Sequence, residues 1–320
     1  MRVGILTSGG DAPGMNACVR AVVRGCIYYG MEVIGIHQGY EGLLNDDMEM
    51  LQTSSVADII HRGGTILQTA RCARFENDEG ILDGYENLRK HGIEALVVIG
   101  GDGTMRGALR LHELTRMRVF GLPGTIDNDL AYTDFTIGFD TSVNTALNAI
   151  GNIRDTSSSH GRTTIIEVMG RDCGDIALHA GLAGGAETIM IPERPFDLDD
   201  IVKKLQAGRD RGKRHSIIVK AEGAAISSAD LAAALTERMG GVEVKVVILG
   251  YIQRGGSPTA RDRILASRTG VRCVELIREG VSNAAIGIKG DTIVDYPLSV
   301  ALAMEKDSHL EYQRICDILL

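Results

Sequence analysis

The chain has 320 residues, of which 44% are hydrophobic and 24% charged, as expected for one large or two modest globular domains. Its net charge of −8 argues against a general nucleic-acid or anionic-membrane surface, and the lack of Trp argues against a base-stacking platform. No apolar run reaches the roughly 20 residues of a membrane-spanning helix. Met1–Gly4 leads directly into an apolar run, so we expect no signal peptide. The six cysteines form no C-x-x-C pair, which predicts free thiols in a reducing cytoplasm.

Short apolar runs alternate with helical patterns along nearly the whole chain. The predicted strands are Val3–Leu6, Val33–Ile36, Ala95–Ile99, Val119–Leu122, Thr164–Val168, Thr188–Ile191, Ser216–Val219, Val244–Leu249 and Ala285–Ile288. The clearest helical patterns are Asn16–Tyr28, Ile81–His91, Ser142–Arg154, Leu198–Arg211, Ala229–Met239 and Arg263–Arg278. This alternation predicts an α/β protein with parallel sheets covered on both faces, and the number of strands predicts two doubly wound sheets. The polar stretch 155–161 is predicted to be a hinge or an active-site loop.

The first glycine-rich loop, residues 7–14, links the first predicted strand to a helix. Its glycines, Gly10 among them, allow a phosphate to approach bare backbone N–H groups, and the N-terminus of the following helix favours an anion. The loop is not a Walker A motif, because no Gly-Lys-Ser/Thr follows. Taken alone, it fits an ordinary tight turn almost as well.

A second glycine-rich loop follows the apolar run Ala95–Ile99 and reads Gly-Gly-Asp-Gly-Thr at 100–104. Asp102 can hold Mg²⁺ directly or through water, while the glycines leave room for a triphosphate. The alternative is an Asp-Gly turn between two elements. The flanking glycines behind a fully apolar strand favour phosphate binding.

The third motif, Pro-Gly-Thr-Ile-Asp-Asn-Asp at 123–129, follows another apolar run. If the chain stays extended past Pro123, then Thr125, Asp127 and Asp129 project from one side. Asp127 is the candidate general base that accepts the proton of an attacking alcohol, and Asp129 is a helper or metal partner. A turn with solvated carboxylates is the alternative. Together with the preceding loop, the motif indicates phosphoryl transfer.

Arginines stand at three further strand or loop ends. Arg162 follows the Ser-rich stretch, Arg171 follows a predicted strand, and Arg254 lies in the segment 251–258. Because Arg binds phosphate through two parallel hydrogen bonds, Arg171 is a candidate for the transferring phosphoryl group and Arg254 for a sugar phosphate. A single surface arginine is more often a solvated charge, but three such placements favour phosphate contacts.

With these motifs together, the chain resembles the bacterial ATP-dependent 6-phosphofructokinases over nearly its whole length. The resemblance is carried by LTSGGDAPGMNA (6–17), GGT (63–65), ALVVIGGDGT (95–104), GLPGTIDND (121–129), IRDTSSSH (153–160), VMGRDCGD (168–175) and GYIQRGGSP (250–258). It implies an ATP- and Mg²⁺-binding domain over 1–138 and 252–303, and a sugar-phosphate domain over 139–251 and 304–320. It also implies a cytoplasmic enzyme without nucleic-acid or membrane partners.

The implied reaction is phosphoryl transfer from MgATP to the 1-hydroxyl of fructose 6-phosphate, with Asp127 as proton acceptor. The resemblance assigns the nucleotide and metal site to Gly10, Arg71, Cys72, Asp102, Gly103 and Thr104. It assigns sugar-phosphate and transition-state contacts to Thr125, Asp127, Asp129, Arg162, Met169, Gly170, Arg171, Glu222, Lys245, Tyr251 and Arg254. Arg162 matches a residue that reaches the neighbouring subunit's sugar site, which implies a homotetramer. An effector site for ADP or phosphoenolpyruvate, shared at a subunit interface, matches Arg20, Arg24, Asp58, Arg154, Glu187, Arg211 and Lys213.

The chain departs from the family pattern at four positions. The family usually has Arg at the position of Lys245 and His at that of Tyr251, both of which normally touch the sugar's 6-phosphate. It commonly has an aromatic residue in place of Cys72 and an effector-site Arg in place of Thr53. We therefore expect the departures to affect sugar-phosphate affinity and regulation, with the catalytic residues intact.

Other activities are compatible with parts of this pattern. Pyrophosphate-using relatives generally carry Asp at the position of Gly103 and Lys at that of Gly124, whereas glycine at both positions leaves space for the α-phosphate and nucleoside of ATP. A kinase of another ketohexose 6-phosphate, such as tagatose 6-phosphate, is a further alternative. A non-catalytic, effector-binding regulatory subunit is disfavoured because Asp102, Asp127 and Arg171 are all retained.

Overall fold

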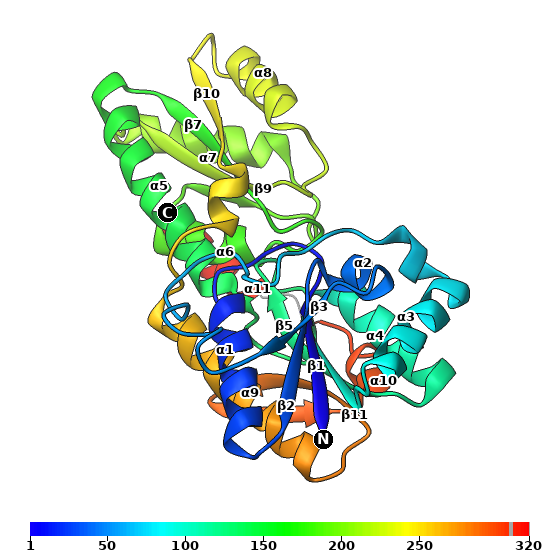
Figure 1. Ribbon diagram of the computed structural model, residues 1–320. Coiled ribbons are helices and arrows are strands. Elements are labelled where there is room, and N and C mark those ends of the chain that lie inside the picture. Colours follow the sequence, from blue (N-terminus) through cyan, green and yellow to red (C-terminus); the bar gives the residue numbers. More distant parts are fainter. Residues whose placement is uncertain (307–309, 320) are drawn as a thin grey trace. The chain divides into compact units, whose positions relative to one another are not determined.

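The computed structural model describes residues 1–306 and 310–319, and the chain divides into two compact units (Figure 1). Unit 1 comprises Met1–Ile126, Leu130–Thr141 and Arg254–Lys306, and unit 2 comprises Asp127–Asp129, Ser142–Gln253 and Asp307–Leu320. Each unit is built around its own sheet, so the prediction of two mainly parallel sheets is confirmed. Within the described residues, no helix has both the length and the apolar character needed to cross a membrane.

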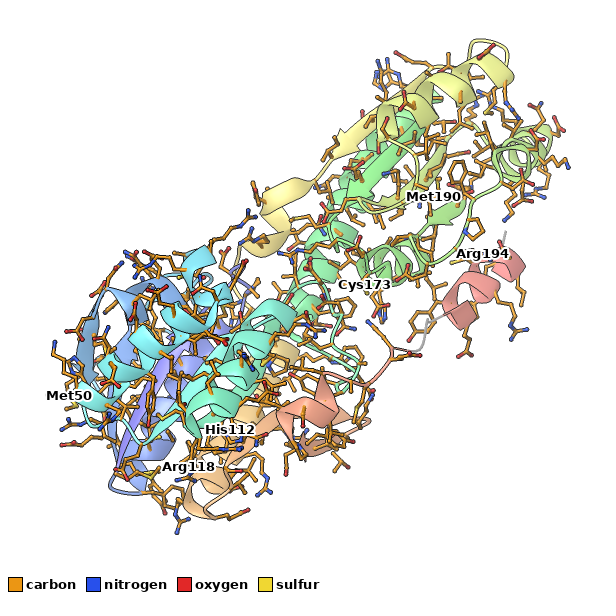
Figure 2. All side chains as sticks on the ribbon, turned by 90° about the vertical axis from the view of Figure 1, so that its right-hand side faces the viewer. Met50, His112, Arg118, Cys173, Met190 and Arg194 are labelled. Atoms are coloured by element: carbon orange, nitrogen blue, oxygen red, sulfur yellow. The ribbon has the colours of Figure 1, made fainter. Side chains whose placement is uncertain are left out.

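The sheet of unit 1 has the strand order β12-β11-β5-β4-β1-β2-β3, with β6 paired to β5. Its strands are β1 (Arg2–Thr7), β2 (Glu32–Ile36), β3 (Met48–Leu51), β4 (Ala95–Gly100), β5 (Arg118–Thr125), β6 (Ile137–Gly138), β11 (Asn283–Lys289) and β12 (Thr292–Tyr296). The pairs β2–β3 and β11–β12 are antiparallel, and the others are parallel. The sequence patterns did not predict the two-residue strand β6 or the edge strands β3 and β12. These edge strands are partly exposed, as the position of Met50 on β3 illustrates (Figure 2), and therefore lack a continuous apolar run.

Helices cover both faces of this sheet, as Figure 1 shows. They are α1 (Met15–Tyr28), α2 (Gly39–Leu44), α3 (Asp78–Lys90), α4 (Asp102–Thr115), α9 (Ala260–Arg278) and α10 (Leu298–Ala301), with a short 3-10 helix η1 (Ala73–Glu76). Helices α1 and α9 pack against each other on one face, and α2, α3, α4 and α10 lie on the other. On the latter face, the rings of Tyr40 and Phe75 stack with centroids 4.0 Å apart. Burial from both sides explains why the central strands read as unbroken apolar runs.

The sheet of unit 2 has the strand order β10-β7-β9-β8, and all its pairs are parallel. Its strands are β7 (Thr163–Val168), β8 (Thr188–Met190), β9 (Ser216–Ala221) and β10 (Val244–Ile248). The associated helices are α5 (Phe139–His160), α6 (Asp175–Ala183), α7 (Leu198–Asp210), α8 (Ser228–Arg238) and α11 (Leu310–Leu319), with the 3-10 helix η2 (Gly250–Arg254) after β10. Met190 on β8 is buried in the core of this unit (Figure 2).

The prediction of a hinge or loop at 155–161 is wrong, because helix α5 continues through His160. Two of its serines make hydrogen bonds that suit a helix. The Ser159 hydroxyl donates to the carbonyl four residues earlier at 2.9 Å, and Ser157 Oγ lies 2.7 Å from Thr164 Oγ1 on β7. The helix ends at Gly161, whose φ of +67° lies in the left-handed region that glycine adopts most readily. Composition alone had favoured a loop because serine is common there.

The first turn of α5 is held by a buried carboxylate from α9. Asp262 is 1% exposed and accepts hydrogen bonds from the backbone N–H groups of Gly138 at 3.0 Å and Thr141 at 2.9 Å, and from the Thr141 hydroxyl at 2.5 Å. These bonds satisfy backbone N–H groups at the start of the helix, where N–H groups have no acceptor within the helix itself. Burial of the carboxyl group raises the pKa of Asp262 to about 6.

This raised pKa predicts a pH-dependent stability. The pKa lies above the ordinary value of 3.8, so the folded chain takes up a proton near pH 6 that the unfolded chain does not. The group therefore stabilises the fold as the pH falls, and this stabilisation is lost as the pH rises through 6. We expect the difference in unfolding free energy between wild type and Asp262→Asn to increase by about 1.3 kcal/mol in favour of wild type between pH 7 and pH 5. Urea unfolding of both proteins at both pH values measures this, and an unchanged or smaller difference would contradict it.

Candidate active site

In unit 1, two predicted glycine-rich loops and the Thr125 segment lie at one edge of the sheet. Strands β1, β4 and β5 are neighbours, with Thr7 paired to Ile99 and Ile99 paired to Leu122, so their carboxyl ends meet. Strand β2 lies on one side of β1 and β4 lies on the other, so the strand order reverses at β1 and β4. Ligands of doubly wound sheets bind outside such a switch point.

Hydrogen bonds tie the two glycine-rich loops together. The Ser8 N–H donates to the Ile99 carbonyl at 3.0 Å, and the Thr104 hydroxyl donates to the Ser8 carbonyl at 3.1 Å. A Cβ atom on Gly100 would come within 2.5 Å of that carbonyl, so this position requires glycine. Thr104 therefore holds the loops in register, although it was predicted as a nucleotide contact.

Asp102 begins helix α4, and its side chain is 40% exposed. Arg106, one turn further on, donates from Nε to Asp102 Oδ2 at 2.7 Å. Among residues 1–306 and 310–319, no cluster of three or more His, Cys, Asp or Glu side chains is arranged to hold a metal ion. An exposed single carboxylate fits Mg²⁺ that arrives with nucleotide phosphates, because Mg²⁺ commonly uses one or two carboxylates plus phosphate oxygens.

The two glycines that bear on donor choice have different surroundings. A Cβ atom at Gly103 would meet no heavy atom within 4 Å, so the space beside this residue is open, as predicted. At Gly124, by contrast, it would lie 2.7 Å from Ile99 Cγ2 and 3.1 Å from Met15 Cε. The side chains of Ile99 and Met15 therefore fill the space next to Gly124 in which a Cβ atom would lie. The interpretation that Gly124 leaves this space to a nucleotide is wrong.

The other predicted nucleotide residues lie in unit 1. Arg71 is exposed, whereas Cys72 is half-buried and precedes η1. Burial, followed by its hydrogen bond with Glu41, raises the pKa of the Cys72 thiol, so the thiol is protonated at neutral pH. Cys72 also packs at the margin of the hydrophobic core on the face of the sheet that α2, α3 and α4 cover.

Arg254 lies against the first glycine-rich loop. Its Nη2 atom is 2.5 Å from Asp11 Oδ1, and a Cβ atom on Gly10 would come within 3.1 Å of the same nitrogen. The sequence predicted Arg254 as a sugar-phosphate contact but did not identify Asp11 as its partner. The guanidinium therefore packs over Gly10, where a larger residue would require Arg254 to shift.

The motif at 123–129 does not stay extended. Strand β5 ends at Thr125, the chain bends, and Asn128 has a φ of +54°, so the predicted alternation of Thr125, Asp127 and Asp129 is wrong. Thr125 belongs to unit 1, where its Cβ lies 3.5 Å from the Cβ position of Gly101. Asp127 is buried and Asp129 is exposed, so the two carboxylates differ in environment.

In unit 2, Asp127 and Arg171 form an ion pair. Arg171 Nε lies 3.4 Å from Asp127 Oδ2. Asp127 is only 8% exposed, whereas the Arg171 side chain is 69% exposed. The neighbouring Asn128 is buried and donates to Asp175 Oδ2 at 2.8 Å, which fixes the bend that carries Asp127. An oriented carboxylate beside an accessible guanidinium is suited to accepting a proton close to a developing phosphoryl charge.

The Arg171 loop is held by side chains that follow neighbouring strands. Glu222 Oε1 accepts hydrogen bonds from the backbone N–H groups of Gly170 at 3.2 Å and Arg171 at 2.8 Å. The Met169 N–H donates to Oε1 of Gln253, which is fully buried, at 3.0 Å. Gln253 is a positioning residue that sequence reasoning missed, because a single glutamine gives no pattern. Gly170 has a φ of +137°, which requires glycine.

Comparison with known proteins identifies the family. The Phosphofructokinase family model matches residues 2–277. The ATP-dependent 6-phosphofructokinase of Clostridioides difficile (strain 630) is 56% identical over 317 residues, which cover 99% of this chain and 98% of that protein. The chain belongs to the phosphofructokinase family. The predicted family resemblance is thus confirmed.

Solved phosphofructokinases also share its fold. The phosphofructokinase of Saccharomyces cerevisiae is 35% identical with a TM-score of 0.90, over 99% of this chain and 46% of that one. This chain therefore spans less than half of the yeast chain. A pyrophosphate-dependent phosphofructokinase from Marinobacter aquaeolei is 25% identical with a TM-score of 0.83, over 98% of this chain and 86% of that chain. Because proteins named for different phosphoryl donors share the fold, the fold alone does not identify the donor.

In this member of the phosphofructokinase family, two predicted phosphate contacts lie far from Arg171 within unit 2. Arg162 precedes β7, whereas Arg171 follows it, and a strand of this length spans roughly 20 Å. Lys245 is the second residue of β10 and pairs with Thr164, so it lies at the same end as Arg162. Both cations contact Glu243, from Arg162 Nε at 2.5 Å and from Lys245 Nζ at 2.6 Å. Tyr251 lies beyond the opposite end of β10 and is exposed.

The predicted effector residues fall into two groups. Arg20, Arg24 and Asp58 belong to unit 1, and Arg154, Glu187, Arg211 and Lys213 belong to unit 2. In unit 2, Glu187, Arg211 and Lys213 line one cavity of about 250 Å³, and Lys213 Nζ contacts Glu187 Oε1. Arg154 donates from Nη2 to the Gly185 carbonyl in the cavity wall at 2.9 Å. The structure therefore brings the second group together.

Proposed function

We propose that this phosphofructokinase transfers the γ-phosphoryl group of ATP to the 1-hydroxyl of D-fructose 6-phosphate, giving fructose 1,6-bisphosphate and ADP, as a glycolytic 6-phosphofructokinase. The observation that carries the proposal is the buried Asp127 carboxylate paired with the exposed Arg171 guanidinium. The similarity to relatives named ATP-dependent 6-phosphofructokinase supports the donor and the acceptor.

In the proposed mechanism, Asp127 takes the proton of the sugar's 1-hydroxyl as its oxygen attacks the γ-phosphorus. The new oxygen–phosphorus bond forms while the bond to the β-phosphate oxygen breaks, and ADP leaves with that electron pair. Arg171 stabilises the negative charge on the transferring group. Glu222 and Gln253 hold the Met169–Arg171 backbone, which keeps the guanidinium beside Asp127. Thr125 and Asp129 are proposed to assist at this centre.

Unit 1 is proposed to bind the nucleotide at the carboxyl ends of β1, β4 and β5. The backbone around Gly10 and Gly103 would face the phosphates, with Arg71, Cys72 and Thr104 bordering the nucleotide. Asp102 would hold Mg²⁺, which when bound neutralises phosphate charge. The open space beside Gly103 supports ATP as the donor.

Unit 2 is proposed to bind the sugar phosphate, with Met169, Gly170 and Glu222 near the sugar and Tyr251 as a further phosphate contact. Arg254, which belongs to unit 1, is also proposed as a phosphate contact. The placement of Arg162 and Lys245 at the far end of β7 and β10 supports a role in a second chain's site. We therefore propose a homotetramer in which Arg162 completes a neighbouring site. ADP and phosphoenolpyruvate are the proposed effectors, and the cytoplasm is the proposed location.

Lys245→Arg should lower the Michaelis constant for fructose 6-phosphate with little change in kcat. Lysine offers a point charge, whereas arginine binds phosphate at two points. A charge-assisted hydrogen bond contributes about 1.5–3 kcal/mol, so the expected change is roughly tenfold or more. Steady-state kinetics of wild type and variant measure it, and Lys203→Arg on the exposed face of α7 is the matched control. An unchanged or higher Michaelis constant would mean that Lys245 is remote from the phosphate or that the acceptor is another sugar.

The proposed donor and acceptor are tested together by measuring kcat/KM for each pairing of ATP or pyrophosphate with fructose 6-phosphate or tagatose 6-phosphate. We expect ATP with fructose 6-phosphate to give the highest value. A preference for pyrophosphate or for tagatose 6-phosphate would replace the proposed substrate. Inactivity with all four pairings would instead favour a regulatory subunit.

A further inference from the structure

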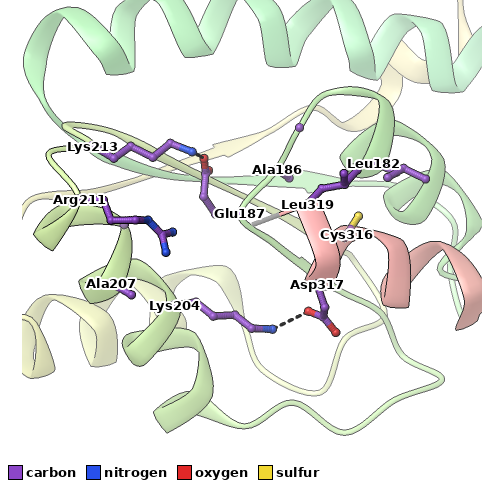
Figure 3. A pocket seen from close by; sticks show the side chains of 12 residues that line it. Leu182, Ala186, Glu187, Lys204, Ala207, Arg211, Lys213, Cys316, Asp317 and Leu319 are labelled. Carbon is purple, nitrogen blue, oxygen red and sulfur yellow. Dashed lines mark hydrogen bonds and ion pairs between the residues drawn. The ribbon is translucent and has the colours of Figure 1, made fainter.

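The cavity that holds Glu187, Arg211 and Lys213 has a wall formed by the C-terminal helix α11 (Figure 3). Helix α7 contributes Lys204, and α11 contributes Cys316, Asp317 and Leu319 to the lining. All these residues belong to unit 2. The proposed effector site therefore includes a segment that none of the predicted effector residues occupies.

Four of the five charged side chains in the cavity lining form two ion pairs. Lys213 contacts Glu187, whose second carboxylate oxygen accepts from the Ile217 N–H at 2.5 Å. Lys204 Nζ lies 2.7 Å from Asp317 Oδ1, the contact drawn as a dashed line in Figure 3. The lining carries one net positive charge, because Lys204, Lys213 and Arg211 outnumber the carboxylates of Glu187 and Asp317.

Lys204 of α7 has an ion-pair partner on a different helix, α11. It also contacts Asp200 on its own helix at 3.0 Å. Burial lowers the pKa of Lys204, but its bonds to Asp317 and Asp200 outweigh burial and the net shift is upward, so the ammonium is charged at neutral pH.

Helix α11 contacts the rest of unit 2 through the buried Cys316, through an ion pair and through a ring contact. Asp317 binds Lys204 on α7, and the Tyr312 ring packs edge-on against His179 of α6 with centroids 4.8 Å apart. An anion that bound Lys204 would compete with the ion pair of Asp317 and leave the ring contact and the buried Cys316 in place. The carboxylate of Asp317 binds the ammonium group of Lys204 in the way that a ligand phosphate would.

We propose that Asp317 is a competing internal anion of this cavity, which an entering phosphate-bearing ligand displaces from Lys204 and thereby loosens α11. The inference rests on the proposed effector function of the cavity and adds Lys204 and Asp317 to its determinants. Effector affinity is then set by competition between ligand and Asp317 for one ammonium group. Binding is coupled to the C-terminal helix by the same contact.

Titration calorimetry with phosphoenolpyruvate tests the proposal, because this ligand is neither donor nor acceptor in the proposed reaction. Asp317→Asn should tighten its binding about three- to tenfold, since a like charge is removed and Lys204 is released. Combining Lys204→Gln with Asp317→Asn should abolish this gain in affinity. Asp317→Glu, which keeps the negative charge, should bind phosphoenolpyruvate with wild-type affinity. Asp199→Asn is the matched control, because it removes the same charge from the exposed pair that Asp199 forms with Arg238, outside the cavity lining.

Amide hydrogen exchange gives a second readout. Exchange in residues 310–319 of the wild type should become faster when phosphoenolpyruvate binds, whereas protection or no change would overturn the proposed displacement. Arg211→Gln separates this inference from the effector site itself. Binding that Arg211→Gln weakens but Asp317→Asn leaves unchanged would keep the effector site and overturn the role of Asp317. Binding that is absent, or insensitive to both substitutions, would overturn both.

Discussion

Asp127→Asn should lower kcat by about 10²–10⁴, the usual contribution of a general base. Asparagine keeps the shape of the side chain but cannot accept the hydroxyl proton. Because Asp127 is buried beside Arg171, the substitution changes the charge at the proposed reacting centre and leaves exposed surfaces unaltered. The Michaelis constant for fructose 6-phosphate should be nearly unchanged, since the proton is transferred only in the reaction.

The matched control for this substitution is Asp172→Asn, which removes a carboxylate from the same loop at an exposed position. It should keep nearly the full turnover. Both variants are compared by steady-state kinetics with saturating ATP. Near wild-type kcat in Asp127→Asn would refute the assignment of Asp127 as the base.

Gly103→Asp should sharply reduce the use of ATP. Gly103 is the second residue of α4, and a side chain there points into open space, so the fold should tolerate the substitution. A carboxylate near a helix N-terminus is also favourable for the helix. Beside a nucleotide phosphate, however, the same carboxylate repels the ligand and occupies its space. Juxtaposed like charges cost several kcal/mol, so we expect kcat/KM for ATP to fall by roughly 10²–10³.

Gly151→Asp is the matched control for Gly103→Asp. Gly151 is also an exposed helical glycine with no heavy atom within 4 Å of its Cβ position, but it lies on α5. The Gly151→Asp variant should keep a kcat/KM for ATP close to that of the wild type. Undiminished use of ATP by Gly103→Asp would place the nucleotide phosphates elsewhere.

The fold was predictable where burial is continuous. Strands such as β4 are buried along their whole length and therefore show as apolar runs in the sequence. The edge strands β3 and β12 escaped prediction because one side of each is exposed and one pairing is antiparallel. The end of α5 was mistaken for a loop because tertiary and local hydrogen bonds of its serines outweigh their weak helix preference.

The candidate site was predictable where a motif is local in sequence. The glycine-rich loops lie together at neighbouring strand ends, as parallel strand order allows. The bend at Asn128 was not predictable, because it depends on a hydrogen bond to Asp175, which lies far along the chain. The support of Met169 by Gln253 and the pairing of Arg254 with Asp11 depend on contacts of the same long-range kind.

Phosphorus NMR of a single reaction mixture tests the central claim most directly. The protein is incubated with fructose 6-phosphate, MgATP and no other phosphoryl donor, and the products are followed by their phosphorus resonances. Our account predicts that a phosphate ester on the 1-hydroxyl appears together with ADP in equal amounts, while orthophosphate does not accumulate. Release of orthophosphate from ATP without a new ester, or the absence of any new ester, would contradict it.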